Sequence, residues 1–216
     1  MNSKYSDQRN ENSMPYVISD HDADFNIKLK MPSKNIAHTK LFLEEGVEDF
    51  SLPGYPVPHG YRFVKALQRD QYRLIAMGDN PETVYLVALR FRNDIVYGRT
   101  TCTQIKVWRT VSSLHGSVVS DLPRTFFANL LKEHSIVVTD EEQTSDGKRF
   151  WETMIVWAFQ SGFHVYISDG TLIDRPLTEI NNMDDFYQQW EKFCWGSDRD
   201  VHTHRLVVIS NDVLEV

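Results

Sequence analysis

The sequence has little of what marks a secreted or membrane-spanning protein. It has only two cysteines, Cys102 and Cys194, far apart and in no CxxC pair, which predicts a reducing compartment and no disulfide framework. No apolar run approaches the ~20 residues that cross a bilayer, and residues 1–13 lack the apolar centre of a secretory signal. We therefore expect a cytoplasmic protein with no membrane partner.

Positive charge and phosphate-binding loops are also scarce. The formal net charge is −7 at pH 7, whereas nucleic-acid-binding domains are usually basic. We therefore expect no nucleic-acid partner, although an acidic protein that imitates nucleic acid stays open as an alternative. The patterns GxGxxG, GxxxxGK[ST] and GxSxG are absent, which removes the usual nucleotide-binding and hydrolase interpretations.

Apolar residues, by contrast, are plentiful: 41% of the 216 residues are hydrophobic and 12% aromatic, which suits one sizeable domain. Residues 136–168 show the clearest pattern. A β-branched strand at 136–139 is followed by an acidic turn, an amphipathic helix that ends near Gly162, and a second strand at 163–168. A strand–helix–strand unit of about 30 residues has the size of a parallel crossover.

The remaining elements follow from alternation, helical spacing and turn residues. Residues 51–61 carry three prolines and two glycines, so they form an irregular loop, either a surface connector or a lid over a site. Further strands are predicted around Phe25, Ile27 and Leu29 and at 62–67, 72–77, 83–91, 105–111 and 204–210, and further helices at 38–45, 122–134 and 183–195.

These elements predict an α+β fold. We expect a disordered N-terminus at 1–15, an N-terminal arm at 16–61, and a domain at 62–216. Its mixed sheet is antiparallel in the first half, locally parallel in the second, and flanked by helices.

The element order resembles the GNAT (Gcn5-related N-acetyltransferase) fold, and more narrowly the GNAT-like proteins of bacteriophages and mobile elements. The resemblance covers roughly residues 62–210. It is carried by the helix at 122–134 together with Trp108, Gly116, Ile136-Val-Val-Thr-Asp140, Gln143-Thr144, Gly147 and Trp151.

The resemblance implies an N-acyltransferase that moves an acetyl group from acetyl-CoA to an amine of a small molecule or a protein. In this family the strand matched by 105–111 splays from the strand matched by 136–139, and acetyl-CoA lies in the opening. The cofactor-binding residues it implies are Val107, Arg109, Val111, Gly116 and Ser117.

The family's loop after the first of these strands carries a Q/R-x-x-G-x-G/A signature, whose amides and following helix N-terminus hold the pyrophosphate. In residues 112–121 only Gly116 remains, and Asp121 adds a negative charge. The alternative is therefore a catalytically inactive GNAT-like binding protein that acts on a host protein.

Acetyl transfer needs a base for the amine and an acid for the leaving thiolate. The candidates are Glu141, with its neighbours Asp140 and Glu142 in the acidic turn, and Tyr166 on the following strand. Both have structural explanations as well, since acids favour a helix N-terminus and aromatic residues pack in strands.

A second set of residues has metal-ligand chemistry. If residues 198–204 are extended, Asp198, Asp200, His202 and His204 share one face. With Cys194 they offer ligands for Zn²⁺, and a polar strand edge is the alternative. We predict no metal site.

Isolated residues give weaker signals. Cys102 is either a nucleophile or a buried packing thiol. The histidines at 59, 115, 134 and 164 show no spacing that indicates a catalytic pair.

Overall fold

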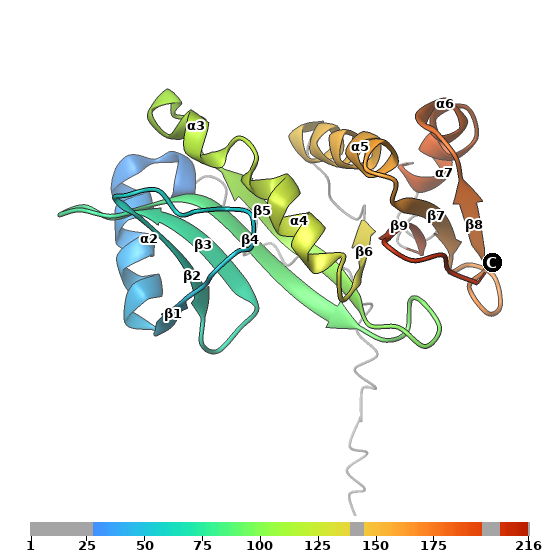
Figure 1. Cartoon of the computed structure of the whole chain (residues 1–216), viewed down its shortest axis with the longest axis horizontal. Coiled ribbons are helices and arrows are strands. Elements are labelled where there is room, and N and C mark those ends of the chain that lie inside the picture. The colour runs from blue at the N-terminus through green and yellow to red at the C-terminus, as the bar shows by residue number, and fades with distance from the viewer. Residues whose placement is uncertain (1–27, 139–144, 196–203, 216) are drawn as a thin grey trace, which may run out of the picture.

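The computed structural model describes residues 28–138, 145–195 and 204–215 (Figure 1). Within them, nine strands form one sheet in the order β1-β2-β3-β4-β5-β6-β9-β7-β8. The strands are β1 (Val47–Asp49), β2 (Tyr61–Ala66), β3 (Gln71–Ala76), β4 (Glu82–Arg92), β5 (Thr101–Arg109), β6 (Ser135–Val138), β7 (His164–Asp169), β8 (Leu177–Ile180) and β9 (Arg205–Ser210).

Helices connect and cover these strands. They are α2 (Pro32–Glu44), α3 (Gly116–Val119), α4 (Leu122–Leu130), α5 (Ser145–Gln160), α6 (Met183–Asp185) and α7 (Glu191–Cys194), with a 3-10 turn η2 (Ser113–His115) and a π-helical segment η3 (Phe186–Trp190). The predicted α+β class and the helix-flanked mixed sheet are confirmed. None of the helices in the described ranges has the length and apolar run needed to cross a membrane.

The first half of the sheet is an antiparallel run from β1 to β5. Its longest strand, β4, is buried from Thr83 to Leu89, because helices cover both of its faces. Alternation along β2 shows this: Val64 and Ala66 pack with Phe42 of α2, while Phe63 packs on the opposite face with the helix α4.

The second half of the sheet contains less parallel strand pairing than predicted. Among the described residues the parallel pairing is that of β5 with β6. Strand β9 lies between β6 and β7 and is antiparallel to both. The strands joined by α5 therefore run in the same direction, as the crossover predicted, but β9 separates them.

The parallel pair is short. Residues Thr101–Thr103 of β5 pair with Ser135–Val137 of β6, and β5 then continues to Arg109. Figure 1 shows the two strands separating beyond this point, with α4 above β5 and α5 above the β6-β9-β7 part of the sheet.

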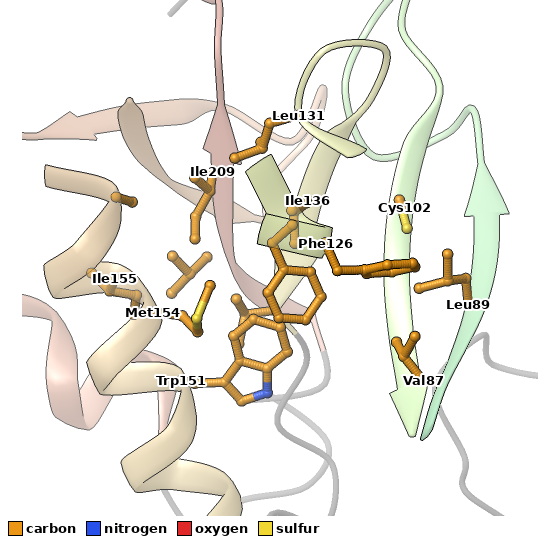
Figure 2. Close-up of a cluster of buried hydrophobic side chains, with 14 of the residues drawn as sticks. Val87, Leu89, Cys102, Phe126, Leu131, Ile136, Trp151, Met154, Ile155 and Ile209 are labelled. Carbon is orange, nitrogen blue, oxygen red and sulfur yellow. The ribbon is translucent and has the colours of Figure 1, made fainter. Parts of the chain in front are cut away.

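One core joins the two halves on the face that α4 and α5 cover. Figure 2 shows Phe126 between Trp151 and Met154 of α5 and the side chains of β4 and β5. The rings of Phe127 and Trp151 stack with centroids 6.0 Å apart. The apolar face of α5, which predicted this helix from the sequence, is thus the face that packs against α4 and the sheet.

Several predicted boundaries were wrong. The strand predicted at 105–111 is β5, which begins at Thr101 and ends at Arg109. The helix predicted at 122–134 is α4, which ends at Leu130. Leu29, predicted in a strand, lies in a helical turn. Phe25 and Ile27 fall outside the described residues, as does segment 1–15.

Candidate functional site

The predicted cofactor-binding residues lie at the carboxyl end of β5 and in the loop after it. Val107 is half-buried against the core and Arg109, the last residue of β5, is exposed. Val111 is 90% exposed. Gly116 opens α3 and is followed by the exposed Ser117.

This loop has ordinary helical geometry at its glycine. Gly116 has φ −54°, and a Cβ there would meet no atom within 4 Å, so no conformational demand requires a glycine. The next helix, α4, has Asp121 at its N-cap, with no hydrogen bond from that side chain to the helix, and Pro123 in its first turn. Because proline lacks an N–H group, the helix start offers one amide fewer to an anion.

The two predicted catalytic residues have different outcomes. Glu141 lies outside the described residues. Tyr166 is fully buried in β7, among Val137, Val208 and Leu214, on the face of the sheet opposite α5. Its hydroxyl accepts a hydrogen bond from the Leu214 N–H at 3.0 Å, and burial raises its pKa. In this position Tyr166 ties the C-terminal segment to the sheet.

A hydrogen-bonded set that the sequence did not reveal lies at the same edge of the sheet as the end of β5. The Tyr61 hydroxyl is 2.9 Å from His115 Nδ1, and His115 Nε2 is 2.8 Å from Glu82 Oε1. We call these three residues the Tyr-His-Glu relay. A carboxylate only accepts hydrogen bonds, so Nε2 donates to Glu82 and Nδ1 accepts from Tyr61.

The sheet register brings the relay together. Tyr61 pairs with Ala76, and Ala76 pairs with Glu82, so the tyrosine and the glutamate occupy one row of the sheet. His115, in η2, lies over that row with its ring edge-on to Tyr61 at 5.9 Å. Its side chain is 12% exposed and that of Glu82 35%, so solvent still reaches the set.

The proline-rich loop is fixed to the same region. Leu52 is buried in the core, and the Tyr55 hydroxyl donates to the Val118 carbonyl of α3 at 2.7 Å. Burial raises the pKa of Tyr55 to about 12, which keeps that hydroxyl a donor. Of the two interpretations of residues 51–61, a connector packed against α3 fits these contacts.

Spacing along the chain could not identify the relay, because Tyr61, Glu82 and His115 lie in separate parts of the sequence. The sequence did contain one indication of the relay, because all three residues lie near the ends of predicted strands. Tyr61 directly precedes the strand predicted at 62–67, and Glu82 directly precedes the one predicted at 83–91. His115 follows the strand predicted at 105–111. Antiparallel neighbours bring alternate strand ends to one edge of a sheet.

The opposite face holds a polar network under α2. Arg73 is 1% exposed, and its guanidinium carbon lies 3.8 Å from the Phe42 ring centroid. Its Nη1 is 3.0 Å from His38 Nδ1 and its Nη2 3.3 Å from Gln71 Oε1. No carboxylate pairs with it within the described ranges. Burial lowers the pKa of Arg73 to about 9, and burial with the nearby Arg73 charge lowers that of His38 to about 4.

The remaining candidates do not form a site in the described part of the chain. Cys102 is fully buried, and burial raises its pKa to about 12, so it is a packing thiol and no thiolate nucleophile. Asp198, Asp200 and His202 fall outside the described residues. Among those described, no group of three or more His, Cys, Asp and Glu side chains is arranged to hold a metal.

Comparison with known proteins leaves this geometry as the main guide to function: no family model, curated protein or solved structure matches the chain.

Proposed function

We propose that this chain is an acyl-CoA-dependent N-acyltransferase, which moves an acetyl group from acetyl-CoA to an amine on a small molecule or a protein. The observation that carries the proposal is the short parallel contact of β5 with β6. The described pairing ends at Thr103 and Val137, while β5 continues to Arg109. In the same sheet, β9 lies between β6 and β7.

The physical reason lies in the backbone of β5. One side of residues 104–109 bonds to β4, whereas on the β6 side no described strand pairs with it beyond Thr103. An extended ligand that carries amide groups, as the pantetheine arm of CoA does, can bond to such an edge in place of a strand. Acetyl-CoA would run along β5 toward Val107, Arg109 and Val111.

The loop after β5 would then meet the phosphate end of the cofactor, at Gly116 and Ser117. Arg109 offers a guanidinium, and the space around Gly116 is open. Glu141 as base and Tyr166 as acid stay predictions of the resemblance.

A second candidate function is that of a catalytically inactive GNAT-like protein that binds a host protein. Two observations favour it. The loop keeps one glycine, without the left-handed geometry of a glycine-built anion cradle, and Asp121 brings a negative charge to the start of α4. Aromatic side chains of α4 and α5, including Phe127 and Trp151, also fill the helix-covered face between the two halves.

Titration calorimetry with acetyl-CoA, with CoA and ATP as comparison ligands, separates the two functions. We expect a dissociation constant between about 1 µM and 1 mM for the wild type. Gly116→Glu should weaken binding at least about tenfold, because it adds a charge where phosphates approach. Gly116→Ala, which the open space accommodates, is the matched control and should bind like the wild type.

No measurable heat from acetyl-CoA with the folded wild type would overturn the transferase proposal and favour the binding protein. Equal affinity of the wild type and Gly116→Glu for acetyl-CoA would show that the cofactor does not bind at this loop.

A further inference from the structure

We infer that the outer side of α2, with the helical turn before it, is a contact surface for an anionic lipid bilayer. The surface combines exposed lysines with exposed apolar side chains. We call it the α2 basic face, and its members are Lys28, Lys30, Met31, Lys34, Lys40 and Leu41. The inference does not depend on acetyl-CoA, so it is independent of the proposed acyl transfer.

The charge of this segment is opposite in sign to that of the whole chain. The chain has 30 acidic and 23 basic residues, yet residues 28–43 contain four lysines and no aspartate or glutamate. Within the part of the chain that the structure describes, Lys30, Lys34 and Lys40 form no salt bridge. Their ammonium groups are therefore free to meet an external anion.

Polar side chains attach α2 to the sheet. Asn35 and Thr39 are buried. The Asn35 amide donates to the Thr83 carbonyl at 2.9 Å and accepts from the Thr83 N–H at 2.9 Å, and Thr39 Oγ1 also accepts from that N–H at 2.9 Å. Together with the buried ring of Phe42, these bonds hold the helix without using the apolar side chains of its outer side.

The outer side of α2 keeps large apolar side chains in solvent. Met31 is 43% exposed and Leu41 59%. Because a helix repeats about every 3.6 residues, Lys34, Ala37 and Leu41 lie on one side of α2, and all three are exposed. A helix that faces only water usually buries its apolar residues and exposes its polar ones. The arrangement in α2 is partly the reverse.

This combination favours a lipid partner. Anionic headgroups attract lysine ammonium groups, and the boundary between headgroups and acyl chains accepts apolar side chains. Nucleic acids are bound largely through arginine forks and through aromatic rings that stack on bases, and the α2 basic face contains neither. The sequence predicted no membrane partner because no apolar run can span a bilayer, but a surface contact needs no such run.

The α2 basic face also lies apart from the helices on the other face of the sheet. Phe42 of α2 packs on one face, whereas Phe126 of α4 packs on the opposite one. Figure 1 shows α2 at the end of the molecule remote from α5, α6 and α7. A bilayer at α2 therefore does not compete with the packing of these helices.

Vesicle sedimentation with the full chain and no acetyl-CoA tests the inference. The wild type should bind vesicles made of equal parts phosphatidylglycerol and phosphatidylcholine at about 0.05 M salt. Binding should be at least about tenfold weaker to phosphatidylcholine alone, and also to the mixed vesicles at about 0.5 M salt, because salt screens exposed charges.

Lys34→Gln/Lys40→Gln should weaken binding to the mixed vesicles at least about tenfold, because each lysine near an anionic surface adds to the attraction. The matched control is Lys132→Gln/Lys192→Gln, which removes the same charge from exposed positions outside α2. It should bind within about twofold of the wild type. Leu41→Ser should weaken binding about threefold or more, because it removes an apolar side chain from the bilayer boundary.

Three results would overturn the inference. The first is sedimentation of the wild type that is absent, or equal with the two kinds of vesicle. The second is an equal loss in the two double variants, which would assign binding to net charge. The third is tighter binding to a fluorescent duplex oligonucleotide than to the mixed vesicles, with that affinity lost in Lys34→Gln/Lys40→Gln, which would make α2 a nucleic-acid surface instead.

Discussion

The neighbours of a histidine decide what it can do in this protein. His115 contacts a carboxylate, Glu82, and a hydroxyl, Tyr61. His38 contacts the buried guanidinium of Arg73 at 3.0 Å, so a positive charge on its ring would be opposed. The second arrangement holds a histidine neutral.

The neutral His38 predicts a loss of stability in mild acid. Its pKa is lowered to about 4 in the folded protein, by burial first and by Arg73 second, whereas an unfolded histidine titrates near 6.5. Between these values the unfolded chain binds the extra proton, so the free energy of unfolding falls as the pH falls. We expect a loss of about 1 to 2 kcal/mol between about pH 7.5 and about pH 5, allowing for partial solvent screening.

Urea unfolding at the two pH values measures this loss. His38→Gln should show a smaller difference between them, because glutamine does not titrate. His59→Gln, at an exposed histidine of the proline-rich loop, should keep the wild-type difference. An undiminished pH difference in His38→Gln would mean that other groups cause it.

At the scale of elements, α5 holds the two halves of the molecule together. Its Trp151 is 7% exposed and stacks on Phe127 of α4, while Ile155 and Ala158 are fully buried against the sheet. At its start Lys148 pairs with Glu191 of α7 at 2.6 Å. The helix thus contacts α4, the sheet and the C-terminal helical segment.

Trp151→Ala should lower the free energy of unfolding by about 3–5 kcal/mol, because it leaves a large cavity between α4 and α5. Trp157, on the same helix, is half-buried, and its ring is tilted against that of Phe163 with centroids 5.2 Å apart. Trp157→Ala should cost at least about 1 kcal/mol less. Denaturant unfolding of both variants checks the ranking, and equal losses would contradict the central position of Trp151.

The elements that could be predicted were those whose pattern is local. Helical spacing of apolar residues gave α5, and alternation gave β2, β3 and β4 within one residue at each end. Strand β8 was missed because only four residues, Leu177–Ile180, form it and half of them face solvent. The insertion of β9 between β6 and β7 is a long-range pairing that no local pattern records.

The site was predictable only in part for the same reason. The stretch from Val107 to Ser117 is continuous in sequence, so its common location at the end of β5 could be foreseen. The relay joins residues 61, 82 and 115, which meet only once the register of three strands is fixed. His115 could not be recognised from the sequence because both of its partners lie on distant strands.

At the scale of the whole molecule, the antiparallel half and the β6-β9-β7-β8 half meet where three residue pairs join β5 to β6. Beyond that contact the carboxyl end of β5, the loop to α3 and the relay all lie at one edge of the sheet. The acyl-CoA site that we propose lies at the carboxyl end of β5, so this edge is the centre of the proposed function.

Hydrogen–deuterium exchange with and without saturating acetyl-CoA tests this placement most directly. Slower exchange in residues 104–119, with no change in the β4–β5 turn at residues 93–100, is the expected result. Bound cofactor would cover the side of β5 that no described strand pairs with beyond Thr103, and the loop after β5. Unchanged exchange in residues 104–119, or protection confined to other parts of the chain, would contradict the placement of an acyl-CoA site at the end of β5.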